Sequence, residues 1–127
     1  MKFTIGLAPI TKKNHQQIIW NKNRPMIIPS KQYKIYEHDC AYFMPPYKME
    51  GRVNVKAHFY MSTRRRVDLV NLLQALLDIL VKYGVLEDDN SKVVVSVDGS
   101  RVFYDKENPR TEVEITEVED ECEQMGL

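Results

Sequence analysis

The residues best suited to chemistry lie between positions 64 and 90. Three consecutive arginines, Arg64, Arg65 and Arg66, come shortly before Asp68, and an apolar run then leads to an acidic turn at residues 87–90. The planar guanidinium group of arginine binds phosphate oxygens through two parallel hydrogen bonds. Adjacent carboxylates repel one another, so some of them need a cation, an arginine or water. The segment thus joins a phosphate-binding cluster to a candidate metal site.

The acidic residues also have an ordinary structural explanation. Asp68 can serve as the N-cap or first-turn acid of a helix, where the helix dipole favours a negative charge. The turn Glu87-Asp88-Asp89-Asn90 resembles acidic turns that are common on protein surfaces. Spacing alone therefore leaves two interpretations open: structural carboxylates, or a pair of metal ligands formed by Asp68 and Asp89.

The run between these groups predicts a long helix at the centre of the molecule. Residues 68–83 contain no glycine or proline, and Gly84 follows where a left-handed C-terminal cap is expected. Apolar side chains cover roughly 200° of the helical wheel. The remaining strip is polar and consists of Asn71, Gln74, Asp78 and Lys82.

The width of this apolar stripe bears on the oligomeric state. It is wider than packing against one sheet requires. The helix must therefore lie between two layers of one subunit or contact a second subunit, and we favour a homodimer. The residues expected at the contact are Val70, Leu77 and Val81 on one flank, or Ile79 on the other.

The other segments predict a single small α+β domain. Alternating apolar residues indicate strands at 2–8, 53–61, 92–97 and 111–118, and Ser30 suits the N-cap of a helix that ends near Phe43. The element order is β–α–β–α–β–β, so we expect a two-layer fold with helices packed on one face of a mixed sheet. The order of the strands is left open. Residues 1–118 are assigned to the domain, and residues 119–127 to an acidic C-terminal tail.

Residues 10–24 predict a long loop or an irregular hairpin, followed by a short apolar segment at 25–29. Long loops in small domains are commonly functional. This one is basic, rich in amides and contains Trp20, which could stack on a base while its neighbours contact the DNA backbone. The other interpretation, which we prefer, is that Trp20 packs on the core under the loop.

Charge is unevenly distributed along the chain. There are 18 basic and 18 acidic residues, so the net charge gives no support to a nucleic-acid partner. The bases concentrate in the first half, whereas the last seventeen residues carry seven acids and no base. This asymmetry suggests a basic face for phosphates and an acidic tail.

Cysteines, histidines and apolar runs argue against several other classes of protein. Cys40 and Cys122 lie far apart without CxxC spacing, and the chain shows no signal peptide and no apolar run long enough to cross a bilayer. We therefore expect a cytoplasmic protein with reduced thiols and no membrane partner. His15, His38 and His58 lack metal-ligand spacing and are interpreted as structural or surface residues.

The central block resembles the RusA-type Holliday-junction resolvases, small dimeric endonucleases of prophage origin that use magnesium or manganese. The shared features are Arg-Arg-Arg-x-Asp-Leu-x-Asn-Leu at residues 64–72, a helix of similar length that contains Asp78, then Gly84, and Leu-x-Asp-Asp at residues 86–89 before a strand. Two outer segments are also similar to the family, namely the loop at 8–14 and the last strand at 111–117.

The resemblance implies a metal-dependent endonuclease that cleaves Holliday junctions or other branched DNA by phosphodiester hydrolysis with a metal-activated water. Asp68 and Asp89 would be its catalytic acids and, together with Asp88, would hold Mg²⁺ or Mn²⁺. A two-fold dimer would present two such sites to the strands of a four-way junction. The expected DNA-binding residues are Arg64, Arg65, Arg66, Lys12, Lys13 and Asn14.

Two positions depart from the family pattern. Val70 stands where many members have a second Asp, and Gln74 stands where they have a Lys on the helix. Another oxygen ligand would have to replace the missing acid. The candidates are Asp88, which we favour, Asp78, Asn71 and Asp98. Asp78 lies about 15 Å along the helix axis from Asp68, too far to share one ion with it. The departures leave an alternative function, a branched-DNA-binding protein with impaired catalysis.

Overall fold

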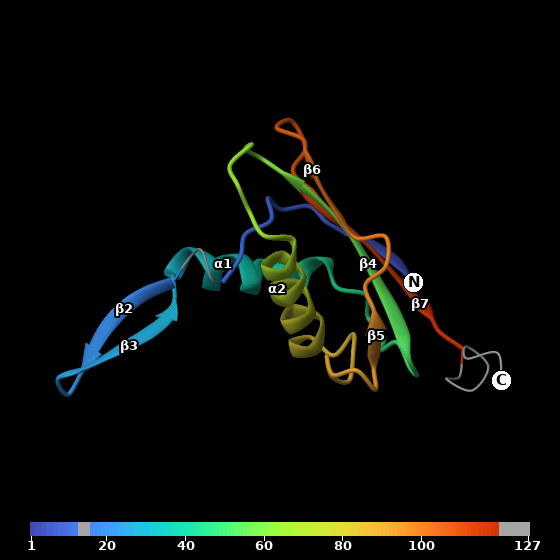
Figure 1. Ribbon diagram of the computed structural model, residues 1–127, viewed down its shortest axis with the longest axis horizontal. Helices are drawn as coiled ribbons and strands as arrows, with labels where there is room; N and C mark the ends of the chain where they lie inside the picture. Colours follow the sequence, from blue (N-terminus) through green and yellow to red (C-terminus); the bar gives the residue numbers. More distant parts are fainter. Residues whose placement is uncertain (13–15, 120–127) are drawn as a thin grey trace.

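In the computed structural model, which describes residues 1–12 and 16–119, a five-stranded mixed sheet carries both helices on one of its faces (Figure 1). The strand order is β1-β7-β4-β5, and β6 also pairs with β4. The strands are β1 (Lys2–Ile5), β4 (Val53–Met61), β5 (Val94–Ser96), β6 (Arg101–Tyr104) and β7 (Arg110–Glu117). The covering layer consists of α1 (Lys31–Cys40), the 3₁₀ turn η2 (Ala41–Phe43) and α2 (Leu69–Lys82). The predicted α+β class and mixed sheet are confirmed.

The middle strand of the sheet is β4, and its sequence explains this position. Val53, Val55, Ala57 and Phe59 recur at every second residue and are at most 2% exposed, as expected for a strand with one face on a core. Burying each large apolar side chain stabilises the fold by roughly 1.5–3 kcal/mol. The strand pairs antiparallel with β7 and parallel with β5 and β6. Its predicted ends match the observed ones.

The helix α2 supplies the other half of the core. Leu72, Leu76 and Leu80 are at most 3% exposed and join the β4 side chains in one hydrophobic cluster. The helix stops before Gly84, whose φ of +75° is the left-handed conformation that glycine adopts without strain. The predicted helix is therefore confirmed. At the other helix, Oγ of Ser30 accepts a hydrogen bond from the Tyr33 amide, so the predicted N-cap of α1 is also confirmed.

The wide apolar stripe of α2 is largely buried within the subunit. Leu77 and Val81 are partly buried and pack against the same core, and Ile79 is fully buried. Ile79 is therefore wrong as a dimer contact, because none of its side chain is left for a partner. Val70, in contrast, is 74% exposed.

Residues 16–29 form a regular hairpin. Its strands β2 (Gln16–Asn21) and β3 (Arg24–Pro29) pair antiparallel through the two-residue turn Lys22-Asn23. Both turn residues have positive φ, 51° and 65°, which is the geometry of the favoured two-residue hairpin turn. The predicted loop thus includes a strand, and the predicted apolar segment 25–29 belongs to the second strand. The prediction that Trp20 packs on the core is wrong, because 72% of this residue is exposed.

The chain beyond α2 forms an interrupted edge strand. β5 and β6 both pair in parallel with β4, at different points along it, and a turn at residues 97–100 separates them. Polar side chains replace backbone pairing there: Oδ1 of Asn54 accepts from the Asp98 amide at 2.8 Å, and the Ala57 amide donates to Oγ of Ser100 at 3.1 Å. The sequence predicts one strand at 92–97 and misses β6. The turn signal at Asp98-Gly99 indicates the end of a strand, but it does not indicate that the chain pairs with β4 again after the turn.

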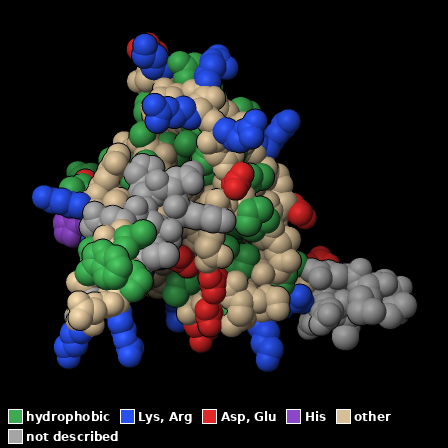
Figure 2. Space-filling view, turned by 60° about the vertical axis from the view of Figure 1, so that its left-hand side comes forward, with side chains coloured by type: hydrophobic (Ala, Val, Ile, Leu, Met, Phe, Trp, Pro, Cys, Tyr) green, Lys and Arg blue, Asp and Glu red, His purple; other side chains and the backbone are tan. Residues whose placement is uncertain are grey.

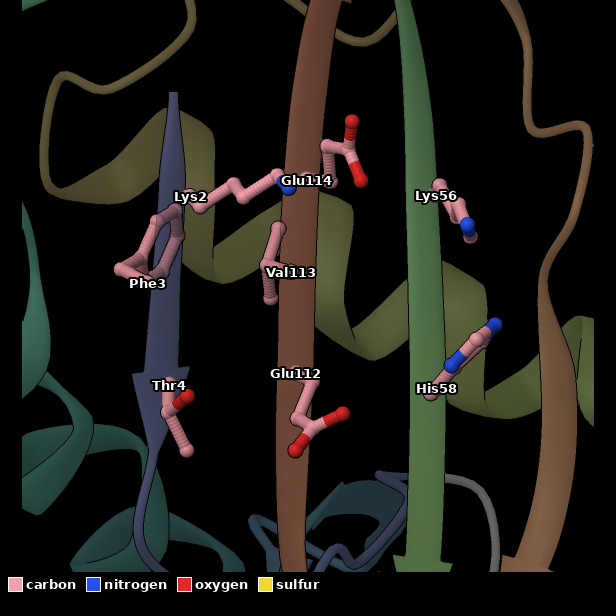
Figure 3. Close-up of a pocket in the computed structure, with 8 residues that line it drawn as sticks. All are labelled: Lys2, Phe3, Thr4, Lys56, His58, Glu112, Val113 and Glu114. Atoms are coloured by element: carbon pink, nitrogen blue, oxygen red, sulfur yellow. The ribbon is translucent and has the colours of Figure 1, made fainter.

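The sheet face opposite the helices is polar and open (Figure 3). Across three strands Lys2 pairs with Glu114, which in turn pairs with Lys56, so opposite charges alternate along this row. The face carries a shallow cavity of about 400 Å³. Nε2 of His58 lies 3.1 Å from the Gly99 carbonyl, which can only accept, so the ring donates this bond. His58 and the exposed His38 agree with the predicted structural or surface roles, whereas His15 lies outside the described residues.

Two further expectations concern thiols and membranes. Cys40 is a buried free thiol, and burial raises its pKa to about 11, so it is not a nucleophile at neutral pH. Cys122 lies outside the described residues. Within residues 1–12 and 16–119 no helix has the length and apolar character needed to span a membrane.

Candidate active site

A polar strip runs along α2 on the side that the core does not use. Asp68, Asn71, Gln74 and Asp78 follow one another at intervals of three and four residues, which places neighbours on one side of a helix. Asp68 occupies the N-cap position but caps no backbone amide. Its Oδ2 instead accepts a hydrogen bond from Nδ2 of Asn71 at 3.2 Å. The carboxylate is thus held by a side chain of the strip and remains exposed.

The acidic turn folds back onto this strip. After Gly84 the chain reverses, and Val85 and Leu86 are at most 1% exposed, which anchors the turn in the core. As a result Asp89 reaches the middle of α2, where its Oδ2 accepts from Nε2 of Gln74 at 3.4 Å. The same nitrogen donates to Oδ1 of Asp78 at 3.0 Å. Residues fifteen positions apart in sequence thereby become neighbours.

Asp68 and Asp89 therefore flank a pair of amides on the same strip. Asn71 holds Asp68 and Gln74 holds Asp89, and these two amides lie one turn apart on α2. Within the described ranges, neither carboxylate forms an ion pair with a lysine, arginine or histidine. Asp68 is exposed and Asp89 is half-buried. Carboxylates without a protein cation are suited to a hard divalent ion, since Mg²⁺ is often held through one or two carboxylates with water in the remaining positions.

Asp88 has a different environment from Asp89. Its Oδ1 accepts from the Asp89 amide at 2.7 Å and its Oδ2 accepts from Nδ2 of Asn90 at 3.0 Å, so both oxygens are used within its own turn. Across residues 1–12 and 16–119 no three His, Cys, Asp or Glu side chains are grouped closely enough to hold a metal together. Any ion at Asp68 and Asp89 would thus also need amide oxygens, water or substrate phosphate as ligands.

Asp98, another candidate third ligand, is held elsewhere. Its backbone is bonded to Asn54 of β4, in the turn that also contacts Lys56 and His58 on the open sheet face. The helix α2 packs on the opposite face (Figure 3), so the sheet separates Asp98 from the strip.

One lysine reaches the strip from the loop after β1. Nζ of Lys12 lies 3.5 Å from Oδ2 of Asp78, and 5.7 Å from the centre of the Tyr33 ring. Lys12, Asp78, Gln74 and Asp89 therefore form a continuous chain of polar contacts. The sequence predicted Lys12 as a DNA-binding residue but did not predict its contact with α2. Lys13 and Asn14, predicted with it, lie outside the described residues.

The three arginines lie in an exposed segment between β4 and α2. Arg65 and Arg66, with the loop at residues 9–11, line a cavity of about 640 Å³. The guanidinium of Arg64 lies 4.0 Å from the centre of the Tyr104 ring, a distance suited to cation–π attraction. None of the three pairs with a carboxylate among residues that the structure describes. Figure 2 shows Lys and Arg side chains gathered at the top of the molecule, the end where this segment lies in Figure 1.

The site is therefore only partly visible in the sequence. Its acids, its arginines and Lys12 were predicted from residue types together with the family resemblance, whereas Gln74 was interpreted only as a missing lysine. Its role in linking Asp78 to Asp89 was missed. The available signal was its place on the polar strip with Asn71 and Asp78, since a polar residue on such a strip has neighbours three or four positions away to bond.

Comparison with known proteins identifies the family of the chain. A family model described as Endodeoxyribonuclease RusA matches residues 7–116, which include both acids, the arginines and Lys12. A search of curated proteins found no match. The family match spans most of the chain, and membership implies an endonuclease that resolves Holliday junctions. The chain therefore belongs to the RusA endodeoxyribonuclease family.

Proposed function

We propose that this protein is a divalent-metal-dependent endonuclease that cleaves Holliday junctions or other branched DNA. The observation that carries the proposal is the position of Asp89, which contacts Gln74 on the same helical strip that begins with Asp68. Asp68 follows Arg66 by two residues, and the three arginines have no acidic partner among the described residues. Junction DNA as substrate follows from membership of the family.

In this proposal Asp68 and Asp89 hold Mg²⁺ or Mn²⁺. The bound ion would supply an activated water and offset negative charge on the phosphodiester. Asn71 and Gln74 orient the two carboxylates by donating to them. Arg64, Arg65 and Arg66 bind the phosphates that flank the scissile bond, because three adjacent cations before a helix suit contacts with the DNA backbone better than contacts with base edges.

The third protein ligand is proposed to be Asn71 or Asp88. Nδ2 of Asn71 donates to Asp68, which leaves its side-chain carbonyl oxygen beside that carboxylate as a possible ligand. Asp88, favoured from the sequence, already uses both oxygens in its turn. We therefore place Asn71 first. Asn71→Leu should then weaken Mg²⁺ binding more than Asp88→Asn does, as measured by the metal concentration needed for half-maximal cleavage.

Lys12 is proposed to replace the lysine that the family carries at position 74. It reaches the strip from a different segment and lies 3.5 Å from Asp78, which Gln74 links to Asp89. An ion pair between partly exposed groups contributes little to stability, so Lys12 can turn toward a phosphate at small cost. The expected result is that Lys12→Ala lowers the rate of cleavage and that Lys12→Arg keeps most of it.

The proposed assembly is a homodimer, because a two-fold pair would place two sites on the two strands of a symmetric junction. Exposed Val70 and the partly buried Leu77 and Val81 remain the proposed contact. Light scattering at micromolar concentration should give twice the mass of the chain. A particle of 14.9 kDa would contradict the dimer.

A cleavage assay tests the proposed function directly. A four-way junction is incubated with the protein in Mg²⁺, in Mn²⁺ and in EDTA, and binding is measured in EDTA alone. Cleavage in either metal with none in EDTA supports the nuclease. Tight binding with no cleavage in either metal would favour the second candidate, a branched-DNA-binding protein with impaired catalysis, for which Val70 and Gln74 in place of the usual Asp and Lys are the motivating observation.

A further inference from the structure

The hairpin formed by β2 and β3, called the arm below, extends away from the body of the molecule (Figure 1). Its two strands pair with each other and with no strand of the main sheet. Six residues per strand correspond to a length of about 20 Å. A hairpin without a covering layer is only marginally stable in water. The arm is therefore expected to gain stability from whatever it contacts.

The arm exposes large apolar side chains. Trp20 is 72% exposed and Ile18 is 64% exposed, and because they are two positions apart on one strand they share a face. Ile19 and Met26, which pair across the strands, are 39% and 42% exposed on the other face. Apolar surface gathered in this way marks a binding site more often than scattered exposed residues do.

The charge of the arm identifies the kind of partner. Residues 1–36 contain no Asp or Glu. Near the turn, Lys22 and Arg24 are exposed and, with Pro25 and Met26, line a hollow of about 540 Å³. A surface that combines cations with an exposed indole and no acid complements phosphates and the flat faces of bases.

The base of the arm adjoins the proposed DNA-binding surface. Thr11 precedes the arm in the chain and Gln32 follows it, and both line the cavity that Arg65 and Arg66 share. Lys12 lies in the same stretch and contacts α2. Cationic groups are thus present at the arginine segment, at the base of the arm and at its turn, so one nucleic acid could contact all three.

We propose that the arm inserts Trp20 into branched DNA, where the indole stacks on a base at the branch point while Lys22 and Arg24 contact the flanking phosphates. Apolar side chains are inserted between bases most easily where stacking is already interrupted, as it is at a branch. The inference rests on the proposed function to the extent that branched DNA is the ligand. It does not depend on catalysis, so the two can fail separately.

Trp20 is the single tryptophan of the chain, so its fluorescence reports on the arm alone. Wild-type protein is titrated in EDTA with a four-way junction and with a linear duplex of the same arm sequence. We expect the tryptophan emission to be quenched strongly at saturating junction and only weakly at saturating duplex. Unchanged emission with the junction bound, or equal quenching by both DNAs, overturns the proposal.

Variants provide a second measurement. Trp20→Ala should bind the junction roughly tenfold more weakly, the loss expected for one stacked base, and should bind the duplex as the wild type does. Trp20→Phe should restore most of the junction affinity. The matched control is Tyr42→Ala, which removes an aromatic ring that is 89% exposed on η2, away from the arm, and should change neither affinity.

The remaining outcomes separate this inference from the nuclease and from a protein partner. Junction-dependent quenching in a protein that never cleaves DNA supports the arm and contradicts the nuclease. Metal-dependent cleavage with no change in Trp20 emission on junction binding contradicts the proposed role of the arm and leaves the nuclease proposal intact. If Trp20→Ala instead converts a dimer to a monomer in light scattering, the arm contacts a second copy of the chain and the proposal is wrong.

Discussion

The single arginine Arg110 and the three consecutive arginines at 64–66 differ in what surrounds them. The guanidinium of Arg110 contacts Asp105 and Glu112, each at 3.0 Å, and lies 3.8 Å from the centre of the Tyr60 ring. Its side chain is 19% exposed. Arg64, Arg65 and Arg66 are exposed and have no carboxylate partner in the described part of the chain.

The difference shows how one residue type serves two purposes. Arg110 uses its Nε and Nη1 donors on oxygens of Glu112, Asp105 and Asn108, so it joins β7 to the preceding loop. The three consecutive arginines keep their donors available, and a phosphate can take the place of the missing carboxylates. Asp105 and Glu112 differ from Asp68 and Asp89 in the same way, because only the first two are neutralised by an arginine.

The largest effect is expected when an unpaired acid is removed. Asp68→Asn or Asp89→Asn should reduce metal-dependent junction cleavage to background, since a neutral amide is a weaker ligand for a hard cation. Binding in EDTA should survive or improve, because negative charge near phosphate is lost. Glu87→Gln, in the same turn as Asp89, is the control and should cleave normally. Full activity of both Asn variants would show that Asp68 and Asp89 do not bind the catalytic metal, although they lack an arginine partner.

A second large effect is expected from the unpaired arginines. Replacing Arg64, Arg65 and Arg66 together by Ala should weaken binding to all junction sequences alike. The negative slope of log affinity against log salt should also become shallower by about 3 units, since each phosphate that an arginine no longer neutralises accounts for about one unit.

Arg110→Ala is the matched control for this series and should leave the salt slope unchanged. If the triple variant loses affinity for some sequences only, the arginines read bases. If Arg110→Ala flattens the slope as much as the triple variant does, the comparison between the two groups is wrong.

A smaller effect is expected at Val70. This side chain is 74% exposed, so an Asp there adds a carboxylate near Asp68 without disturbing the core. Provided that light scattering shows the same mass as for the wild type, Val70→Asp should raise single-turnover cleavage or leave it unchanged. A fall in a variant of unchanged mass would argue against metal binding at Asp68. Should the wild type bind junctions without cleaving them while Val70→Asp with Gln74→Lys cleaves, the protein is a binding module descended from an enzyme.

Arg110 itself should affect stability and leave function intact. Arg110→Ala leaves the carboxylates of Asp105 and Glu112 without their shared cation and removes the cation–π interaction with Tyr60. We expect a lower thermal midpoint by calorimetry, with junction affinity unchanged. Arg66→Ala, measured beside it, should keep the wild-type midpoint. A lower midpoint for Arg66→Ala and an unchanged one for Arg110→Ala would show that Arg66, and not Arg110, stabilises the fold.

The smallest effect concerns pH. Hydrogen bonds from the Asn108 amide and from Arg110 hold the pKa of Asp105 below its usual value near 3.8. Because the folded pKa is the lower one, the stabilisation is present above pH 3.8 and is lost as pH falls below it. Asp105→Asn should therefore lower the thermal midpoint at pH 6, and the difference between the two proteins should shrink as pH falls below 3.8. If the difference in thermal midpoint between the two proteins does not change with pH, the destabilisation comes from altered packing and not from the charge of Asp105.

Much of the fold could be predicted from the sequence, because its signals are local. The alternation from Val53 to Phe59 specifies β4, and the apolar stripe ending at Gly84 specifies α2. Ser30 marks the start of α1 in the same way. Each of these patterns is contained within one element and does not depend on the rest of the chain. The arginine segment and the two acids were likewise visible as residue types in a fixed order.

Only the tertiary structure decided which polar groups meet. The contact between Gln74 and Asp89 requires the chain to reverse after α2 and requires Val85 and Leu86 to be buried against residues far away in the sequence. Pairing of β6 with β4 and the exposure of Trp20 are likewise set by which surfaces remain uncovered once the core has formed. Side-chain periodicity reports which face of an element is apolar, but the position of that face relative to a distant residue depends on packing between elements, which no local pattern contains.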